Sequence, residues 1–92
     1  RIDAAGHEVW IGDHPVALTR TEFDILDVLS AQPRLALSRR QLIDAVWDTA
    51  WVGDEHVVDV HVANLRKKLD DDPTEPRYIT TIRGVGYRMG RG

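Results

Sequence analysis

The segment VVDVHVANLRKKL, residues 57–69, can be interpreted as a strand or as a helix. Its first half nearly alternates β-branched and polar residues, as a strand does, whereas its second half consists of good helix formers. At about 100° per residue, four aliphatic residues fall within about 60° of arc, at the spacing of a buried helical stripe. These four are Val58, Val62, Leu65 and Leu69. A strand would split them between two faces, so we predict one helix over residues 55–69.

The face of this helix opposite the stripe mixes apolar, amide and cationic side chains. Its members are His56, Val60, Ala63 and Lys67, with Asp59 and Asn64 beside them. Methyl-bearing side chains can meet thymine methyl groups, and an amide can pair with adenine through two hydrogen bonds. Arg66, Lys67 and Lys68 complement the helix dipole and can equally reach phosphates. The pattern fits either an ordinary solvated face or a surface that reads base edges.

Two shorter helices are predicted upstream of this one. Thr19 with Glu22, and Ser38 with Gln41, have the spacing of capping boxes. The first helix should run to about residue 32, where a proline stops it, and the second should end near Trp47. Residues 48–54 are predicted to form a loop, and Asp54 has the side chain of an N-cap for the third helix.

Both ends of the chain are predicted to form strands. Residues 2–4, 8–11 and 16–18 are extended pieces separated by turn-type residues, which indicates a small antiparallel meander. Residues 78–82 and 87–89 flank a tip at 83–86 that contains two glycines, which indicates a β-hairpin. Arg83 at that tip is either a plain surface arginine or a probe for the negative potential of a narrow minor groove.

The order of these elements predicts an α+β chain with a winged helix-turn-helix. It comprises an N-terminal antiparallel β-sheet, three helices and a C-terminal β-hairpin wing. Ninety-two residues form one domain, and we assign residues 1–18 to the sheet, 19–69 to the three-helix core and 76–90 to the wing. The chain is expected to be part of a longer protein, because it does not begin with methionine.

Charge and composition limit the possible functions. The net charge of −3 argues against a generic nucleic-acid binder, but its distribution is uneven. Residues 1–54 carry a net charge of −4, residues 55–92 carry +1, and four arginines with no acid follow Pro76. The absence of cysteine excludes disulfides and thiolate metal sites, and no apolar run is long enough to cross a membrane.

An enzyme is not expected. The sequence has no Gly-x-Ser-x-Gly, His-Glu-x-x-His or P-loop motif, and the glycines at 84 and 86 precede no helix. His56 and His61 lie about 140° apart on a helical wheel, so they do not make a shared metal site. We therefore expect no catalytic residues, no metal and no cofactor.

Four segments together resemble a known family. LTRTEFDIL (18–26), SRRQLIDAVW (38–47), VVDVHVANLRKKL (57–69) and YITTIRGVGYRM (78–89) occur in the order and approximate spacing of the OmpR/PhoB-type effector domain. The resemblance spans essentially the whole chain. It implies a winged helix with a four-stranded N-terminal sheet, and it implies the DNA-binding half of a bacterial two-component response regulator.

The resemblance also implies which residues contact DNA. Base contacts are expected from the third helix, which enters the major groove, and from the wing arginine in the minor groove: His56, Val60, Ala63, Asn64, Lys67 and Arg83. Backbone contacts are expected at positions on the second helix, the third helix and the wing: Arg39, Trp47, His61, Arg66, Thr81 and Tyr87. Some relatives have arginines where this chain has His56, Ala63 and Asn64, which suggests a different base preference.

Further partners follow from the same resemblance. The loop that contacts RNA polymerase in relatives corresponds to Asp48, Thr49, Ala50, Trp51, Val52, Gly53 and Asp54. A receiver domain, absent from this chain, would carry the phosphorylation control. The domain is expected to be cytoplasmic, monomeric alone and dimeric on tandem half-sites of double-stranded DNA. The alternative that remains open is a winged-helix module that binds protein and not DNA, which the acidic total and the apolar Trp51 and Val52 support.

Overall fold

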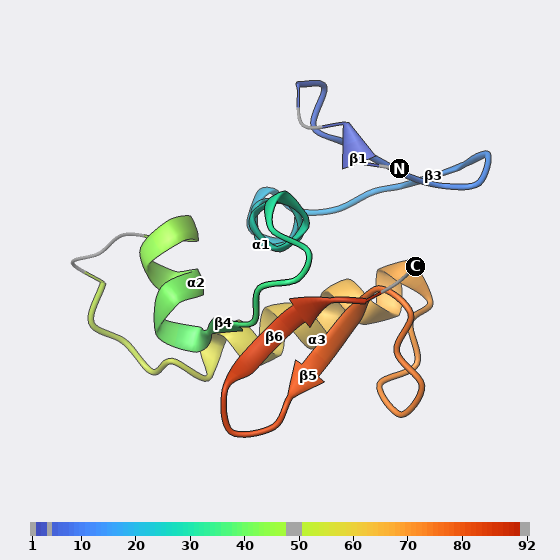
Figure 1. Cartoon of the computed structure of the whole chain (residues 1–92). Coiled ribbons are helices and arrows are strands. Elements are labelled where there is room, and N and C mark those ends of the chain that lie inside the picture. Colours follow the sequence, from blue (N-terminus) through green and yellow to red (C-terminus); the bar gives the residue numbers. More distant parts are fainter. Residues whose placement is uncertain (1, 4, 48–50, 91–92) are drawn as a thin grey trace.

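The computed structural model describes residues 2–3, 5–47 and 51–90, which form three helices and two small antiparallel sheets (Figure 1). The N-terminal sheet has the order β1-β2-β3 and the C-terminal sheet the order β4-β6-β5. In Figure 1 the N-terminal sheet lies above α1, and the strands β5 and β6 cross in front of α3. No helix in the described part of the chain is long and apolar enough to span a membrane.

The N-terminal sheet is a meander, as predicted, but its last turn is tighter. The strands are β1 (Ile2–Asp3), β2 (Glu8–Ile11) and β3 (His14–Val16). The predicted third strand at 16–18 was wrong, because Gly12 has φ +58° and closes a two-residue turn that lets Ile11 pair with His14. Pro15 is tolerated because β3 is an edge strand. The described residues form three strands here and not the implied four, since the chain then passes directly to the cap of α1.

Both predicted capping boxes are present. In α1 (Arg20–Ala31), the backbone N–H of Glu22 donates to Thr19 Oγ1 at 3.2 Å, and the N–H of Thr19 donates to Glu22 Oε1 at 2.9 Å. In α2 (Arg39–Val46), Ser38 and Gln41 repeat this exchange. Each box satisfies backbone donors that a helix N-terminus leaves free, and so sets where the helix begins.

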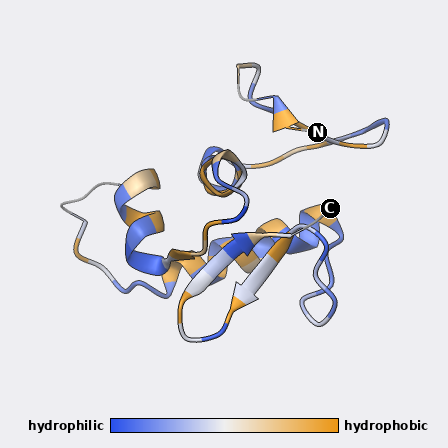
Figure 2. Cartoon of the chain, viewed as in Figure 1, coloured by the Kyte–Doolittle hydropathy of each residue, from blue (hydrophilic) through white to orange (hydrophobic). Residues whose placement is uncertain are grey.

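The third helix, α3 (Val57–Leu69), carries the predicted stripe. All four of its members are buried: Val58, Val62, Leu65 and Leu69. They join core residues of α1, α2 and β2 and of the strands β5 and β6, and Figure 2 shows hydrophobic positions recurring along α3. The assignment as one helix is therefore confirmed.

The start of α3 differs from the prediction. The helix begins at Val57, and its N-cap residue is His56, which makes no side-chain capping bond. Asp54 acts one step earlier, where its carboxylate accepts the backbone N–H of His56 at 2.9 Å. Residues 55 and 56 form a turn, because the N–H groups of Val57 and Val58 donate to carbonyl oxygens three residues back.

The wing consists of β5 (Ile79–Ile82) and β6 (Gly86–Met89), joined by a three-residue tip at 83–85. A strand not predicted from the sequence, β4 (Leu37–Ser38), pairs with β6. Only glycine fits at Gly86, since a Cβ there would lie 2.0 Å from the carbonyl oxygen of Leu37. The pairing ties the wing to the segment that leads into α2.

Asp71 differs from its acidic neighbours Asp70 and Asp72, which are both exposed. Its side chain is buried, with 6% of the residue exposed. One carboxylate oxygen accepts the backbone N–H of Arg77 at 2.7 Å, and the other accepts that of Ile79 at 3.0 Å. The carboxylate thus replaces strand partners at the point where the chain enters β5.

Replacing Asp71 with alanine should lower the free energy of unfolding by about 2–4 kcal/mol, because buried N–H donors at the start of β5 would lose their acceptor. Denaturation in urea measures this change. Asp72→Ala is the matched control, since the side chain of Asp72 is exposed and bonds only within its own turn. Equal effects of the two substitutions would contradict the assigned role of Asp71.

Candidate nucleic-acid interface

The face of α3 opposite the buried stripe is open to solvent. Its members are exposed, as predicted: His56, Val60, Ala63, Asn64 and Lys67. Val60 is the most informative, because 58% of this large aliphatic residue is exposed in the first turn of α3. The side chains of Asn64 and Lys67 make no hydrogen bond to any described residue, so their polar groups are available to a ligand. We call these five residues the reading face.

The tip of the wing presents a second exposed feature. Arg83 and Val85 are exposed, and Gly84 between them has φ +77°, a conformation that glycine adopts without strain. The N–H of Val85 donates to the carbonyl of Ile82 at 2.9 Å and closes the turn. No carboxylate in the described residues pairs with Arg83, so the tip offers one cation beyond the end of the sheet.

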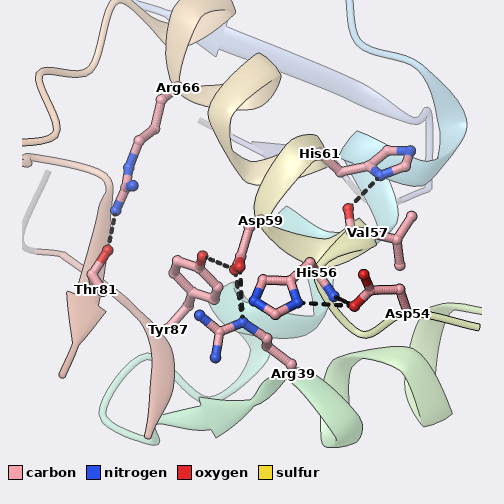
Figure 3. Close-up of polar contacts among 9 residues, drawn as sticks. All are labelled: Arg39, Asp54, His56, Val57, Asp59, His61, Arg66, Thr81 and Tyr87. Atoms are coloured by element: carbon pink, nitrogen blue, oxygen red, sulfur yellow. Dashed lines mark hydrogen bonds and ion pairs between the residues drawn. The ribbon is translucent and has the colours of Figure 1, made fainter. Parts of the chain in front are cut away.

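Asp59 connects three elements beside the reading face (Figure 3). Arg39 of α2 donates from Nε to both carboxylate oxygens of Asp59, at 2.8 and 3.0 Å. The hydroxyl of Tyr87 on β6 donates to the same carboxylate. Tyr87, predicted to touch the DNA backbone, is only 5% exposed. Its hydroxyl therefore serves the contact between α3 and the wing in this structure.

A second polar contact joins α3 to the wing two turns further along the helix. Arg66 donates from Nη2 to the backbone carbonyl of Ile79 and to Thr81 Oγ1, both at 2.8 Å (Figure 3). Its guanidinium also lies 5.8 Å from the centre of the Tyr87 ring. Arg66 and Thr81 were both predicted to contact the DNA backbone, and in the structure they are hydrogen-bonded to each other.

The two histidines of this region are each oriented by one hydrogen bond. Nδ1 of His56 donates to Asp54 at 2.9 Å, and Nδ1 of His61 donates to the carbonyl of Val57 at 2.9 Å. The acceptors have no proton to give, so Nδ1 carries the hydrogen in both rings and Nε2 is left for other partners. The ring of His61 also packs edge-on against half-buried Trp47, with 5.3 Å between centroids. Trp47 is thereby held against α3.

Hydrogen bonds determine the ionisation of the Asp59 cluster. Burial alone would raise the pKa of Asp59, but hydrogen bonds from Arg39 and Tyr87 outweigh it and leave the pKa below its ordinary 3.8. Burial and the neighbouring carboxylate raise the pKa of Tyr87 to about 12. The hydrogen bond to Asp59 also raises the pKa of Arg39. At neutral pH the cluster is therefore an ion pair with a neutral tyrosine hydroxyl.

The loop before α3 is only partly described. Asp48, Thr49 and Ala50 lie outside the described residues. Trp51 packs against the core and lies 6.3 Å from Trp47 between ring centroids, whereas Val52, Gly53 and Asp54 are exposed. Within the described residues, no three side chains of the kinds that bind metals come together.

Comparison with known proteins identifies the family. The family model described as transcriptional regulatory protein, C terminal, matches residues 13–89. The chain belongs to this family. The resemblance to OmpR/PhoB-type effector domains, and the winged-helix fold that it implied, are thus confirmed.

Three relatives illustrate the family membership. Over 89 residues, 97% of its length, this regulatory domain is 42% identical to the sensory transduction protein RegX3 of Mycolicibacterium smegmatis, but it spans only 39% of that protein. It superposes on the Klebsiella pneumoniae RstA DNA-binding domain, solved in complex with the RstA box, with a TM-score of 0.88 and 35% identity over 97% of this chain and 88% of the other. The superposition on the Thermotoga maritima OmpR/PhoB homologue DrrB has a TM-score of 0.87 and 36% identity. It covers 97% of this chain and 40% of DrrB.

Asp59 was not among the predicted site residues. One signal in the sequence could have indicated it, because Asp59 is the only acid between residues 56 and 69 and lies next to the predicted reading face. Its partners, Arg39 and Tyr87, are 20 and 28 residues away in the sequence. Spacing along one helix cannot reveal contacts of that kind.

Stability of this regulatory domain should fall in acid. Asp59 and Glu22 both have a pKa below their ordinary values of 3.8 and 4.5, Glu22 because hydrogen bonds from Lys68 and Thr19 outweigh its burial. A carboxylate whose pKa is lower in the folded state contributes stability above the unfolded pKa, and loses it as pH falls through the folded value. The free energy of unfolding should therefore stay level from about pH 7 to 5 and drop below about pH 4.5.

Urea denaturation across this pH range measures the effect. Asp59→Asn and Glu22→Gln should each reduce the fall in the free energy of unfolding at acid pH. Asp13→Asn, at an exposed turn position, should leave that fall unchanged. If the free energy of unfolding falls as steeply in acid in both Asp59→Asn and Glu22→Gln as in the wild type, these two carboxylates are not the cause of the acid sensitivity.

Proposed function

We propose that this domain binds double-stranded DNA in a sequence-specific manner and regulates transcription as the output domain of a response regulator. α3 enters the major groove, and the wing reaches the adjacent minor groove. The observation that carries the proposal is the reading face, which is exposed because the stripe on the other side of α3 is buried in the core. The similarity to RstA, whose domain was solved on its DNA box, supports it.

The chemistry of the reading face suits base edges. An α-helix fits the major groove, which is about 12 Å wide, and short side chains let it approach closely. Val60 and Ala63 present methyl groups of the kind that contact thymine. Asn64 has a free amide for adenine, and Lys67 adds a cation that reaches guanine or a phosphate. The reading face thus carries groups that discriminate between bases, and it has little excess charge of its own.

Backbone contacts come from cations around this face. Arg39, at the start of α2, is one such cation. Arg83 at the wing tip, which we assign to a base contact, extends toward the minor groove, whose negative potential attracts arginine. We also assign backbone contacts to Trp47 and His61, whose rings pack together beside α3. The junction of α3 and the wing is formed by Arg66, Thr81 and Tyr87. Their contacts hold the two elements that carry this surface. The local cations thereby offset the net charge of −3.

Further parts of the proposal concern the longer protein. The chain spans about two fifths of RegX3, and we propose that a receiver domain in the remainder controls it by phosphorylation. Two copies would then bind tandem half-sites in the cytoplasm, while the domain alone is monomeric. The exposed residues 52–54 lie in the loop assigned to RNA polymerase, the partner expected of a transcription regulator.

Selection of duplexes from a random pool, followed by affinity measurements over a range of salt concentrations, tests this function. The enriched duplexes should share one half-site, and log affinity should fall linearly with log salt, with a slope of about −0.9 per phosphate contact. A module that binds only protein would enrich no sequence and form no specific duplex complex at any salt. That result would refute the proposal.

Asn64→Ala should relax base preference at one position of the half-site. If the amide pairs with a base edge, discrimination at that position should fall by about 1–3 kcal/mol, while the salt slope stays the same. Competition between single-base variants of the selected duplex measures this. Lys67→Ala is the contrasting control if its amine contacts phosphate, since it should weaken binding to all variants alike and reduce the slope. Unchanged preference in Asn64→Ala would remove this residue from the base contacts.

A further inference from the structure

A carboxylate beside a surface that binds DNA needs an explanation. Asp59 lies on α3 between the buried stripe and the reading face, and its side chain is 29% exposed. A negative charge at such a place repels phosphates, so its direct effect on DNA binding is unfavourable. A favourable effect of Asp59 on DNA binding must therefore act through the residues bonded to it, Arg39 and Tyr87.

Asp59 holds Arg39 by one part of its guanidinium only. Both carboxylate oxygens accept from Nε, and no described carboxylate pairs with the two terminal nitrogens, Nη1 and Nη2. The guanidinium is planar, so fixing Nε restricts the directions in which the terminal N–H groups can point. The Arg39 side chain is 40% exposed. Arg39 is therefore oriented by Asp59 through Nε and has Tyr87 as a further neighbour, while its terminal N–H groups pair with no described carboxylate and can meet a phosphate.

Asp59 also holds the wing. Tyr87 lies on β6, and its hydroxyl donates to Asp59. The ring of Tyr87 is buried in the core. Arg66, seven residues along α3, bonds to Ile79 and Thr81 on β5. Two bonded points about two turns apart fix the wing relative to α3 in both position and direction. The distance between the reading face and Arg83 is then set by these contacts.

We propose that Asp59 is a positioning residue for DNA binding. Through Nε it directs Arg39 toward a backbone phosphate, and through Tyr87 it keeps the wing arginine at the separation from α3 that two adjacent grooves require. The inference rests on the proposed function and adds to it an acidic residue whose removal weakens binding to a polyanion.

The sign of the effect distinguishes positioning from simple electrostatics. Asp59→Asn keeps the shape of the side chain but removes the charge and one of the two acceptor oxygens. Electrostatics alone predicts tighter DNA binding in this variant, because a negative charge near phosphates is lost. Positioning predicts weaker binding, because Arg39 and Tyr87 lose a partner that fixed them.

The experiment measures the affinity of the 92-residue chain for a duplex selected by the wild type. Asp59→Asn should bind about tenfold more weakly, whereas the matched control Glu55→Gln should bind equally well or up to about threefold more tightly. Glu55 is exposed just before α3, and its side chain has no partner among the described residues. Circular dichroism melts identify a temperature at which every variant is folded, and binding is compared there.

A double-mutant cycle tests the route through Arg39. Arg39→Ala should cost about tenfold in affinity in the wild type and less than about twofold in the Asp59→Asn background, because Arg39 is no longer directed there. Tyr87→Phe tests the wing separately, and should reduce the cost of Arg83→Ala in the same way. A residue that only stabilises the fold would leave these costs unchanged.

The outcomes separate the two levels of the argument. If Asp59→Asn binds as tightly as the wild type or more tightly, or if the costs of Arg39→Ala and Asp59→Asn are independent, the positioning role is refuted while DNA binding stands. If the wild type selects no duplex, the proposed function itself fails. Weaker binding with coupled costs supports both.

Discussion

Burial of four aliphatic side chains along one side of α3 sets the orientation of this helix and therefore of the surface opposite. Val58, Val62, Leu65 and Leu69 are almost completely removed from water, and each contributes about 1.5–3 kcal/mol by that burial. Because they lie in one stripe, they leave the helix a single orientation against α1 and the wing. The opposite side then has to face solvent, and Val60 and Asn64 are exposed for that reason and not by any preference of their own.

Polar contacts complete what the stripe begins. A hydrophobic stripe orients a helix but permits small slides and rotations, which directional bonds between charged groups prevent. Lys68 bonds to the buried Glu22 of α1 at 2.7 Å, while Asp59 and Arg66 bond to the wing. α3 is thus held by ionic or charged hydrogen bonds on two sides. Such rigidity suits an interface that has to match two grooves of a duplex at once, since little ordering remains to be done on binding.

The predictable features were those encoded locally. Capping boxes at Thr19 and Ser38 depend on residues three apart, and the stripe of α3 depends on one helical period, so both could be found from the sequence. Features that depend on distant pairs were missed or misplaced. β4 has only two residues and exists because Gly86 lets β6 approach Leu37. The roles of Asp59 and Asp71 likewise depend on residues brought close by the fold, and so does the burial of Tyr87.

We propose that the exposed side of α3 and the tip of the wing form one surface for duplex DNA. The most direct measurement is a nuclear magnetic resonance titration of the isotopically labelled domain with a selected duplex. We expect the largest shift changes at the amides of residues 56–67 on α3 and of residues 83–85 on the wing, with the N-terminal sheet unaffected. Changes confined to the N-terminal sheet or to residues 51–54, with α3 unmoved, would contradict it.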